Sequence, residues 1–180
     1  VAVQGLGALE YVLHGTGADT LETPQGDFRC RYGRAIAGNL VHLGQAIQDG
    51  WAKETGGIVE RLTNPRDDDP AYRTADDSLK EIVGVFINGF EAIRDLRLKP
   101  AMGESEKAAR PKLFLFHRSE LALASLRANF AGMQTLFTAS DVASLLPEAQ
   151  AYLKDSILFE FENADMALGK LQPPLTEVVG

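Results

Sequence analysis

The sequence has little that would place it among cross-linked, membrane-spanning or nucleic-acid-binding proteins. One cysteine in 180 residues excludes an intrachain disulfide and a cysteine-rich zinc site. No run approaches the roughly 18 consecutive apolar residues that a membrane-spanning helix needs. The formal charge is -7 and the basic residues are scattered, so no basic stripe is present and nucleic acid is not expected as a partner.

The composition is otherwise that of an ordinary globular protein, with 45% hydrophobic and 24% charged side chains. Such a chain has enough apolar side chains for a sizeable core. The first residue is Val1 instead of Met, and the residues after it read as the interior of a helix. We therefore expect that an upstream segment has been removed, together with any signal peptide or lipid-anchor cysteine that it carried.

Four long stretches repeat apolar residues at steps of three and four, which is the spacing of one helix face. The stripes are Phe28, Tyr32, Ile36, Leu40, Leu43, Ile47 and Trp51; Leu79, Val83, Phe86, Phe90 and Ile93; Leu123, Leu126, Phe130, Met133 and Phe137; and Leu153, Ile157, Phe161, Ala164, Leu168 and Leu171. No segment alternates with a period of two, so we expect almost no strand. The sequence predicts an all-α fold, packed as an antiparallel up-and-down helical bundle.

Shorter helical pieces are predicted around the four long helices. Residues 1–13 form a fifth helix that is apolar on nearly every side, which favours a place between layers. Residues 58–62 carry one more turn, and residues 175–179 begin another helix. Pro100 is expected to end the second long helix, because a proline lacks the backbone N–H that a helix interior requires.

Residues 4–15 form the most unusual stretch. Gly5 and Gly7 lie inside the predicted helix, where each glycine costs about 1 kcal/mol against alanine, so another helix or a ligand should approach closely. Glu10 and His14 are four residues apart and could hold one metal ion from a single helix, although two ligands are too few. Alternatively, His14 interacts with the helix dipole, and Glu10 forms either a structural Glu–Arg pair or part of a ligand site.

Several short motifs occur in a consistent order along most of the chain. They are Gly5-Leu6-Gly7-Ala8-Leu9-Glu10-Tyr11, Phe28-Arg29-Cys30-Arg31-Tyr32, Trp51, Leu96-Arg97-Leu98-Lys99-Pro100, His117-Arg118-Ser119 and Leu126-Arg127-Ala128-Asn129. In this order they resemble the imelysin family, bacterial insulin-cleaving membrane proteases and their relatives, whose motif is G-x-H-x-x-E. Gly7 stands where that motif has histidine. Because a glycine cannot replace an imidazole, the zinc-peptidase activity of the family is in doubt here.

The resemblance implies an exported protein of the periplasm or outer membrane, built as two helical bundles with a cleft near the motif and associated with iron uptake. Residues 1–26 would be the motif helix and a connection left from a preceding helical domain, and residues 27–180 a bundle truncated at its C-terminal end. Carried over residue by residue, the ligand-binding cleft consists of Gly5, Gly7, Glu10, Arg29, Tyr32, Arg118 and Ser119, with Glu10 and Arg29 as a polar pair.

Three functions follow as hypotheses. The first is a ligand-binding or structural component linked to iron or metal uptake, without peptidase activity of its own. The second is a zinc-dependent metallopeptidase that uses Glu10, His14 and a ligand from the missing segment. The third is a scaffolding helical module. The expected cofactor is iron or zinc, and the expected partners are a small ligand, metal or peptide and an envelope protein; membrane contact would come only through the lost lipid anchor.

Four other features carry weaker predictions. His42 lies on the first long helix beside its apolar stripe and is expected to be a hydrogen-bonded residue at the edge of that stripe instead of a ligand. His117 is either part of the cleft or a solvated residue in the first turn of a helix, and the second is the preferred interpretation. The run Asp67-Asp68-Asp69 is expected to form a solvated loop. Cys30 lies between two arginines, which could make it reactive, but a buried thiol is the preferred interpretation.

Overall fold

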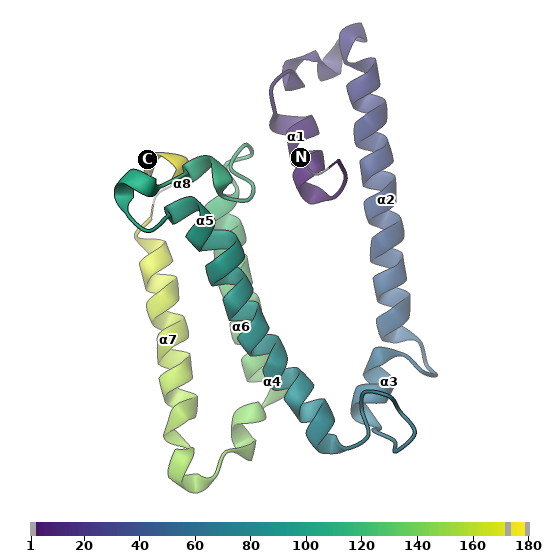
Figure 1. Cartoon of the computed structure of the whole chain (residues 1–180), viewed down its shortest axis with the longest axis vertical. Coiled ribbons are helices and arrows are strands. Elements are labelled where there is room, and N and C mark those ends of the chain that lie inside the picture. Colours follow the sequence, from purple (N-terminus) through teal and green to yellow (C-terminus); the bar gives the residue numbers. More distant parts are fainter. Residues whose placement is uncertain (1–2, 172–173, 179–180) are drawn as a thin grey trace. The chain divides into compact units, whose positions relative to one another are not determined.

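The computed structural model describes residues 3–171 and 174–178, and every regular element within these ranges is helical (Figure 1). The all-α prediction is therefore confirmed. None of the helices described is both long enough and apolar enough to cross a lipid bilayer. The α-helices are α1 (Leu6–His14), α2 (Asp27–Ala52), α3 (Ile58–Thr63), α4 (Ala75–Ala92), α5 (Lys99–Met102), α6 (Ala122–Ser140), α7 (Tyr152–Gly169) and α8 (Leu175–Val178).

The chain divides into two compact units, unit 1 (Val1–Val85) and unit 2 (Phe86–Gly180), with the division inside α4. Within unit 1, α1 packs against the first half of α2, so the motif helix and the first long helix share one core. The predicted division into domains at residues 1–26 and 27–180 stays a prediction.

The motif helix α1 is shorter than the sequence suggested, and this part of the prediction was wrong. Gly5 has a φ of 94°, a backbone conformation outside the helix, so α1 begins only at Leu6. The helix is also not buried on every side. Ala8 and Val12 are buried in the core shared with α2, and Glu10 is buried as well, whereas Leu6 and Tyr11 are exposed.

Helices α1 and α2 lie side by side (Figure 1), and Val12 of α1 lies close to Gly33 of α2. A Cβ atom at Gly33 would lie only 2.9 Å from Cγ1 of Val12. Around this crossing, Ala8, Val12 and Ile36 form the small core of unit 1. The glycine is therefore required by packing, since a methyl group would force the two helices apart.

The second half of α2 has the predicted period but not the predicted burial. Ile36 is 3% exposed, whereas Ile47 is 63% and Trp51 is 48% exposed. Cys30 is also exposed, so the preferred interpretation as a buried thiol was wrong. Both differences have one cause, which is that α1 covers only the face of α2 that carries Gly33 and Ile36.

The loop before α4 is more ordered than a solvated acidic run. Asp69 accepts two hydrogen bonds from Arg61, of 2.7 and 2.8 Å, and two from the backbone amides of Ala71 and Tyr72. The Arg61 guanidinium also lies 5.1 Å from the centre of the Tyr72 ring. The prediction of a merely solvated loop was therefore wrong for Asp69, which closes the loop onto α3.

These contacts predict an acid-sensitive loop. Hydrogen bonds from Arg61 and from the Tyr72 and Ala71 amides hold the pKa of Asp69 well below its usual range. A carboxylate with a depressed folded-state pKa stabilises the fold above its unfolded pKa, about 3.9, and loses that stabilisation as the pH falls further. In an NMR titration of the folded protein we expect the Tyr72 amide resonance to stay unchanged down to about pH 4 and to shift only well below that pH, because Asp69 keeps its charge there. In Asp69→Asn the shift should be absent; an unchanged titration would contradict this assignment.

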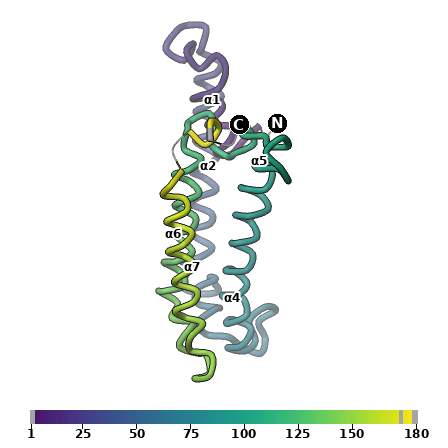
Figure 2. Tube along the Cα trace, turned by 90° about the vertical axis from the view of Figure 1, so that its left-hand side faces the viewer, coloured from purple at the N-terminus to yellow at the C-terminus, as the bar shows by residue number. Residues whose placement is uncertain are grey.

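Unit 2 contains the second half of α4 together with α6 and α7, which run antiparallel and side by side (Figure 2). Five phenylalanines join the three helices, with ring centroids 5.6–6.3 Å apart: Phe86, Phe90, Phe130, Phe137 and Phe161. At the other end of the unit, α5, α6, α7 and α8 meet in a second core that includes Phe114 and Leu126. Unit 2 therefore has two apolar centres along its length.

The second long helix does not end at Pro100 as predicted. A π-helical segment, Ile93–Leu98, follows α4 and leads directly into α5, which contains Pro100. Pro100 lies in the first turn of α5, where a backbone N–H has no partner within the helix. The proline is therefore tolerated, and the helical path continues to Met102.

Candidate functional site

The predicted site residues are divided between the two units. In unit 1, Glu10 lies on α1 and is only 7% exposed. It is two residues from both Ala8 and Val12, so it lies on the opposite side of the helix from that buried pair. A buried carboxylate costs free energy unless polar groups interact with it. This cost makes Glu10 the most informative residue of the motif.

The Arg29 guanidinium donates to the carbonyl oxygens of Val12, Thr16, Tyr11 and Gly15, at 2.8, 2.7, 2.6 and 3.3 Å. The Glu10–Arg29 pair that the sequence suggested stays a prediction. These carbonyls lie at and just beyond the C-terminal end of α1, where the helix dipole favours a positive charge. Arg29 therefore caps the motif helix from α2.

Tyr32 holds the segment that precedes α1. Its hydroxyl donates a hydrogen bond to the carbonyl oxygen of Val3, and its ring stacks with Phe28 at 6.3 Å between centroids. Asn39 adds a 3.4 Å hydrogen bond from its side-chain amide to Gln4. Tyr32 and Arg29 thus attach to the two ends of the motif, one before α1 and one after it.

The two motif glycines have different structural roles. Gly5 needs its positive φ to lead the chain into α1. Gly7 lies inside α1, and a Cβ atom built on it would meet nothing within 4 Å. The expected close approach to Gly7 is therefore not observed among the described residues. The helix face is open at the position where the family motif has histidine.

This difference between glycines predicts opposite effects on stability. Gly7→Ala should stabilise unit 1 by about 1 kcal/mol, because alanine favours the helix and meets no neighbour. Gly33→Ala should instead destabilise it by about 1–2 kcal/mol, because Val12 is β-branched and cannot easily turn away. Urea unfolding of both variants measures the difference; a destabilised Gly7→Ala would show that this face is in fact occupied.

His14 is the last residue of α1 and is exposed, unlike Glu10. Among the described residues, no group of three or more His, Cys, Asp or Glu side chains is arranged to hold a metal ion. Glu10 and His14 as metal ligands, with iron or zinc as the cofactor, stay a prediction.

In unit 2, Arg118 and Ser119 lie in the segment between α5 and α6. The flanking residues Phe116 and Glu120 have positive φ angles of 63° and 61°. Such a backbone is strained for non-glycine residues, and strained residues cluster at functional sites. The sequence did not indicate this strain, since no glycine marks either position.

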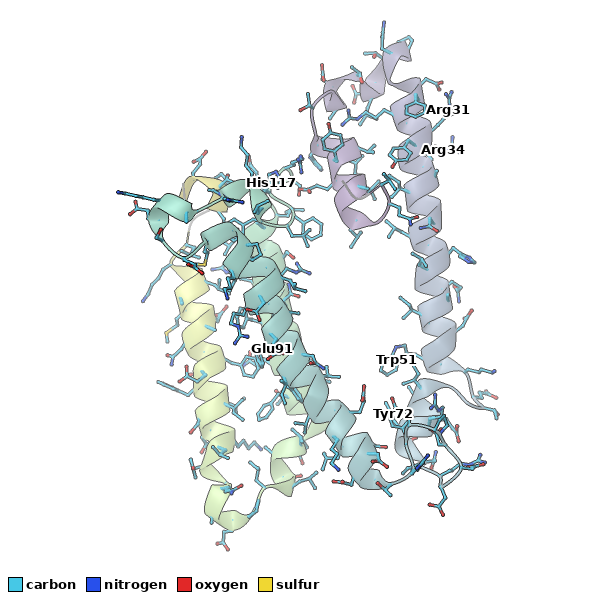
Figure 3. All side chains as sticks on the ribbon, in the orientation of Figure 1. Arg31, Arg34, Trp51, Tyr72, Glu91 and His117 are labelled. Carbon is cyan, nitrogen blue, oxygen red and sulfur yellow. The ribbon has the colours of Figure 1, made fainter. Side chains whose placement is uncertain are left out.

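Three hydrogen bonds stabilise the backbone conformation of the segment from Phe114 to Leu121. The His117 Nδ1–H donates to the carbonyl oxygen of Phe114 at 3.0 Å, and the Ser119 hydroxyl donates to that of Phe116 at 3.2 Å. The backbone amide of Leu121 also donates to Phe116. His117 is half-buried and precedes α6, so the prediction of a solvated first-turn residue was wrong (Figure 3).

The fold and these residues define an all-helical protein whose motif helix carries a buried carboxylate and is capped by an arginine from the next helix. The sequence profile of the imelysin family, peptidase family M75, matches residues 1–179. The chain belongs to the imelysin family. Neither a curated protein nor a solved structure matches it.

Proposed function

We propose that this chain is an exported ligand-binding or structural component of the imelysin type, linked to iron or metal uptake and without peptidase activity of its own. Members of the imelysin family are generally exported. The periplasm or outer membrane is the proposed location, and an envelope protein the proposed macromolecular partner.

The observation that carries the proposal is the burial of Glu10 on the motif helix. Apart from Glu10, the buried residues of α1 are the apolar Ala8 and Val12, so the carboxylate is held out of water on a largely apolar helix. Retention of a carboxylate at such a position is typical of a binding site. The fixed ends of the motif, held by Arg29 and Tyr32, favour a preorganised site.

The absence of an imidazole at position 7 supports the non-enzymatic part of the proposal. Gly7 supplies no ligand atom and no acid or base, so the G-x-H-x-x-E chemistry of the family would lack one group. Arg118 and Ser119 are proposed as further ligand-binding residues, because their segment is strained and carries a guanidinium and a hydroxyl.

The test combines metal binding with peptide cleavage on the full chain. Zinc and ferrous iron are titrated calorimetrically into the wild type, Glu10→Gln, and the matched control Glu22→Gln, whose carboxylate is exposed. We expect Glu10→Gln to weaken metal binding at least about tenfold, Glu22→Gln to leave it unchanged, and no variant to cleave peptides. Equal binding in Glu10→Gln would exclude Glu10 from the site, and stoichiometric zinc with peptide cleavage would refute the non-enzymatic function.

The second candidate is a zinc-dependent metallopeptidase that uses Glu10. Two observations favour it: the family is a peptidase family, and Glu10 and His14 are four residues apart on one helix. Under this hypothesis Glu10→Ala abolishes hydrolysis. Hydrolysis that survives Glu10→Ala would exclude it.

A further inference from the structure

Unit 2 contains a cavity of about 360 Å³ that is separate from the motif helix. It lies between α4, α6 and α7 and is lined by Phe90, Phe130, Ser156, Ile157, Glu160 and Phe161. The surface that these residues present to the cavity is almost wholly carbon. Phe90 and Ile157 are 36% and 38% exposed, so the cavity is open to solvent and a molecule can enter it. This volume falls in the range of small-molecule sites.

The two polar residues of the lining form their hydrogen bonds within α7. The Ser156 hydroxyl donates to the carbonyl oxygen of Tyr152 at 3.1 Å, and a Glu160 carboxylate oxygen accepts a 3.4 Å hydrogen bond from Asn163. Ser156 and Glu160 therefore contribute mainly carbon atoms to the lining. A charged or strongly polar ligand would lose its hydrogen bonds to water here without replacing them. The cavity therefore favours an uncharged, apolar molecule.

The volume of the cavity indicates the size of that molecule. An apolar cavity of about 150 Å³ holds one benzene ring. At about 360 Å³ the cavity in unit 2 has more than twice that volume, which suits two fused six-membered rings. Along α7 the lining extends only from Ser156 to Phe161, about one and a half turns of the helix, so a compact molecule fits better than an extended chain.

The three aromatic rings of the lining are inclined to one another instead of stacked. Phe90 lies 5.6 Å from Phe161 at an angle of 45°, and 6.2 Å from Phe130 at an angle of 46°. Inclined rings present both edges and faces to the space between them. An aromatic ligand gains from such edge-to-face and offset contacts in addition to the burial of its surface, whereas a saturated ligand of the same size gains from burial alone.

We propose that this cavity binds a neutral molecule with two fused aromatic rings, which lies among the side chains of Phe90, Phe130 and Phe161. The molecule is held by burial of its apolar surface and by ring contacts, and it forms no ion pair. The site lies wholly in unit 2 and does not depend on Glu10 or on the proposed metal-uptake function.

The test compares naphthalene with decahydronaphthalene, its saturated counterpart, and with 2-naphthoate, which carries a charge on the same rings. Each is titrated into the full chain while the ring resonances of Phe90 and Phe161 are followed by NMR. We expect naphthalene to bind at least about threefold more tightly than decahydronaphthalene and at least about tenfold more tightly than 2-naphthoate. If naphthalene shifts neither resonance, or if either of the other compounds binds as tightly, the proposal is overturned.

Two variants locate the bound molecule. Ser156→Leu fills part of the cavity and should weaken naphthalene binding at least about tenfold, whereas Asp155→Leu, at an exposed position on the same helix outside the lining, should leave it unchanged. Phe90→Leu keeps an apolar side chain but removes a ring, and should weaken binding of naphthalene more than binding of decahydronaphthalene. Unchanged naphthalene affinity in both Ser156→Leu and Phe90→Leu would overturn the proposal.

Protein concentration distinguishes a small ligand from a second copy of the chain. The naphthalene titration is repeated at a tenfold higher protein concentration, and we expect the same affinity at both concentrations. An affinity that falls as the protein concentration rises would show that a second copy covers the cavity, and this result would also overturn the proposal.

Discussion

Arg29→Ala is expected to destabilise unit 1 by about 2–4 kcal/mol, since one guanidinium donates four hydrogen bonds to carbonyl oxygens at the end of α1. The alanine variant would leave these carbonyls without their capping partner and would remove a positive charge from the negative end of the helix dipole. Urea unfolding measures the loss, and amide hydrogen exchange in α1 should accelerate with it.

Arg31→Ala is the matched control for Arg29→Ala. Arg31 is exposed on the same helix and forms an exposed ion pair with Asp27, four residues earlier, so its loss should change stability by less than about 0.5 kcal/mol (Figure 3). Arg29→Lys should recover only part of the stability, because an ammonium group cannot spread its donors over four carbonyls. Equal stabilities of Arg29→Ala and Arg31→Ala would contradict the capping role.

Phe114→Ala is expected to destabilise unit 2 by about 3–5 kcal/mol. Phe114 is 3% exposed and packs in the core with Ile93, Leu123 and Leu126, so its removal leaves a cavity there. The same residue accepts the His117 hydrogen bond through its carbonyl oxygen, and its side chain anchors the start of the strained segment. We therefore expect residues 116–120 to relax toward negative φ angles, which three-bond HN–Hα couplings measure by NMR.

The neighbouring Leu113 provides the control for Phe114→Ala. Leu113 is exposed, so Leu113→Ala should cost less than about 1 kcal/mol and leave the couplings of Phe116 and Glu120 unchanged. If Phe114→Ala unfolds unit 2 altogether, Phe114→Leu retains part of the apolar contact and should show an intermediate loss. A Phe114→Leu variant as stable as the wild type, with unaltered couplings, would contradict the anchoring role.

The long helices could be predicted because the apolar residues of one helix face recur every three or four residues in the sequence. The steps of three and four residues from Ile36 to Trp51 indicated α2 correctly. The same periodicity did not show which part of the apolar stripe is covered by a neighbouring helix. Trp51 is exposed although it continues the pattern. Periodicity shows which side chains share a face, whereas burial depends on the neighbouring helix.

The site was less predictable because its interactions join residues far apart in the sequence. The hydrogen bonds of Arg29 reach back 13–18 residues to carbonyl oxygens, which every residue carries and no motif can mark. Glu10 was identified because an acidic residue among apolar neighbours is unusual. The contact of Asp69 with Arg61 was not predicted, because Asp69 follows two other aspartates and such an acidic run is typical of a solvated loop.

The arginine cap on α1 also limits how the motif can move. Four hydrogen bonds from the Arg29 side chain join α2 to the last turn of α1 and to the two residues after His14, while Gly33 lets the two helices pack closely. The carboxylate of Glu10 cannot shift by fraying of α1 alone. Any motion that carries the Glu10 carboxylate toward or away from a bound molecule must therefore move α1 and the first half of α2 together as one rigid body.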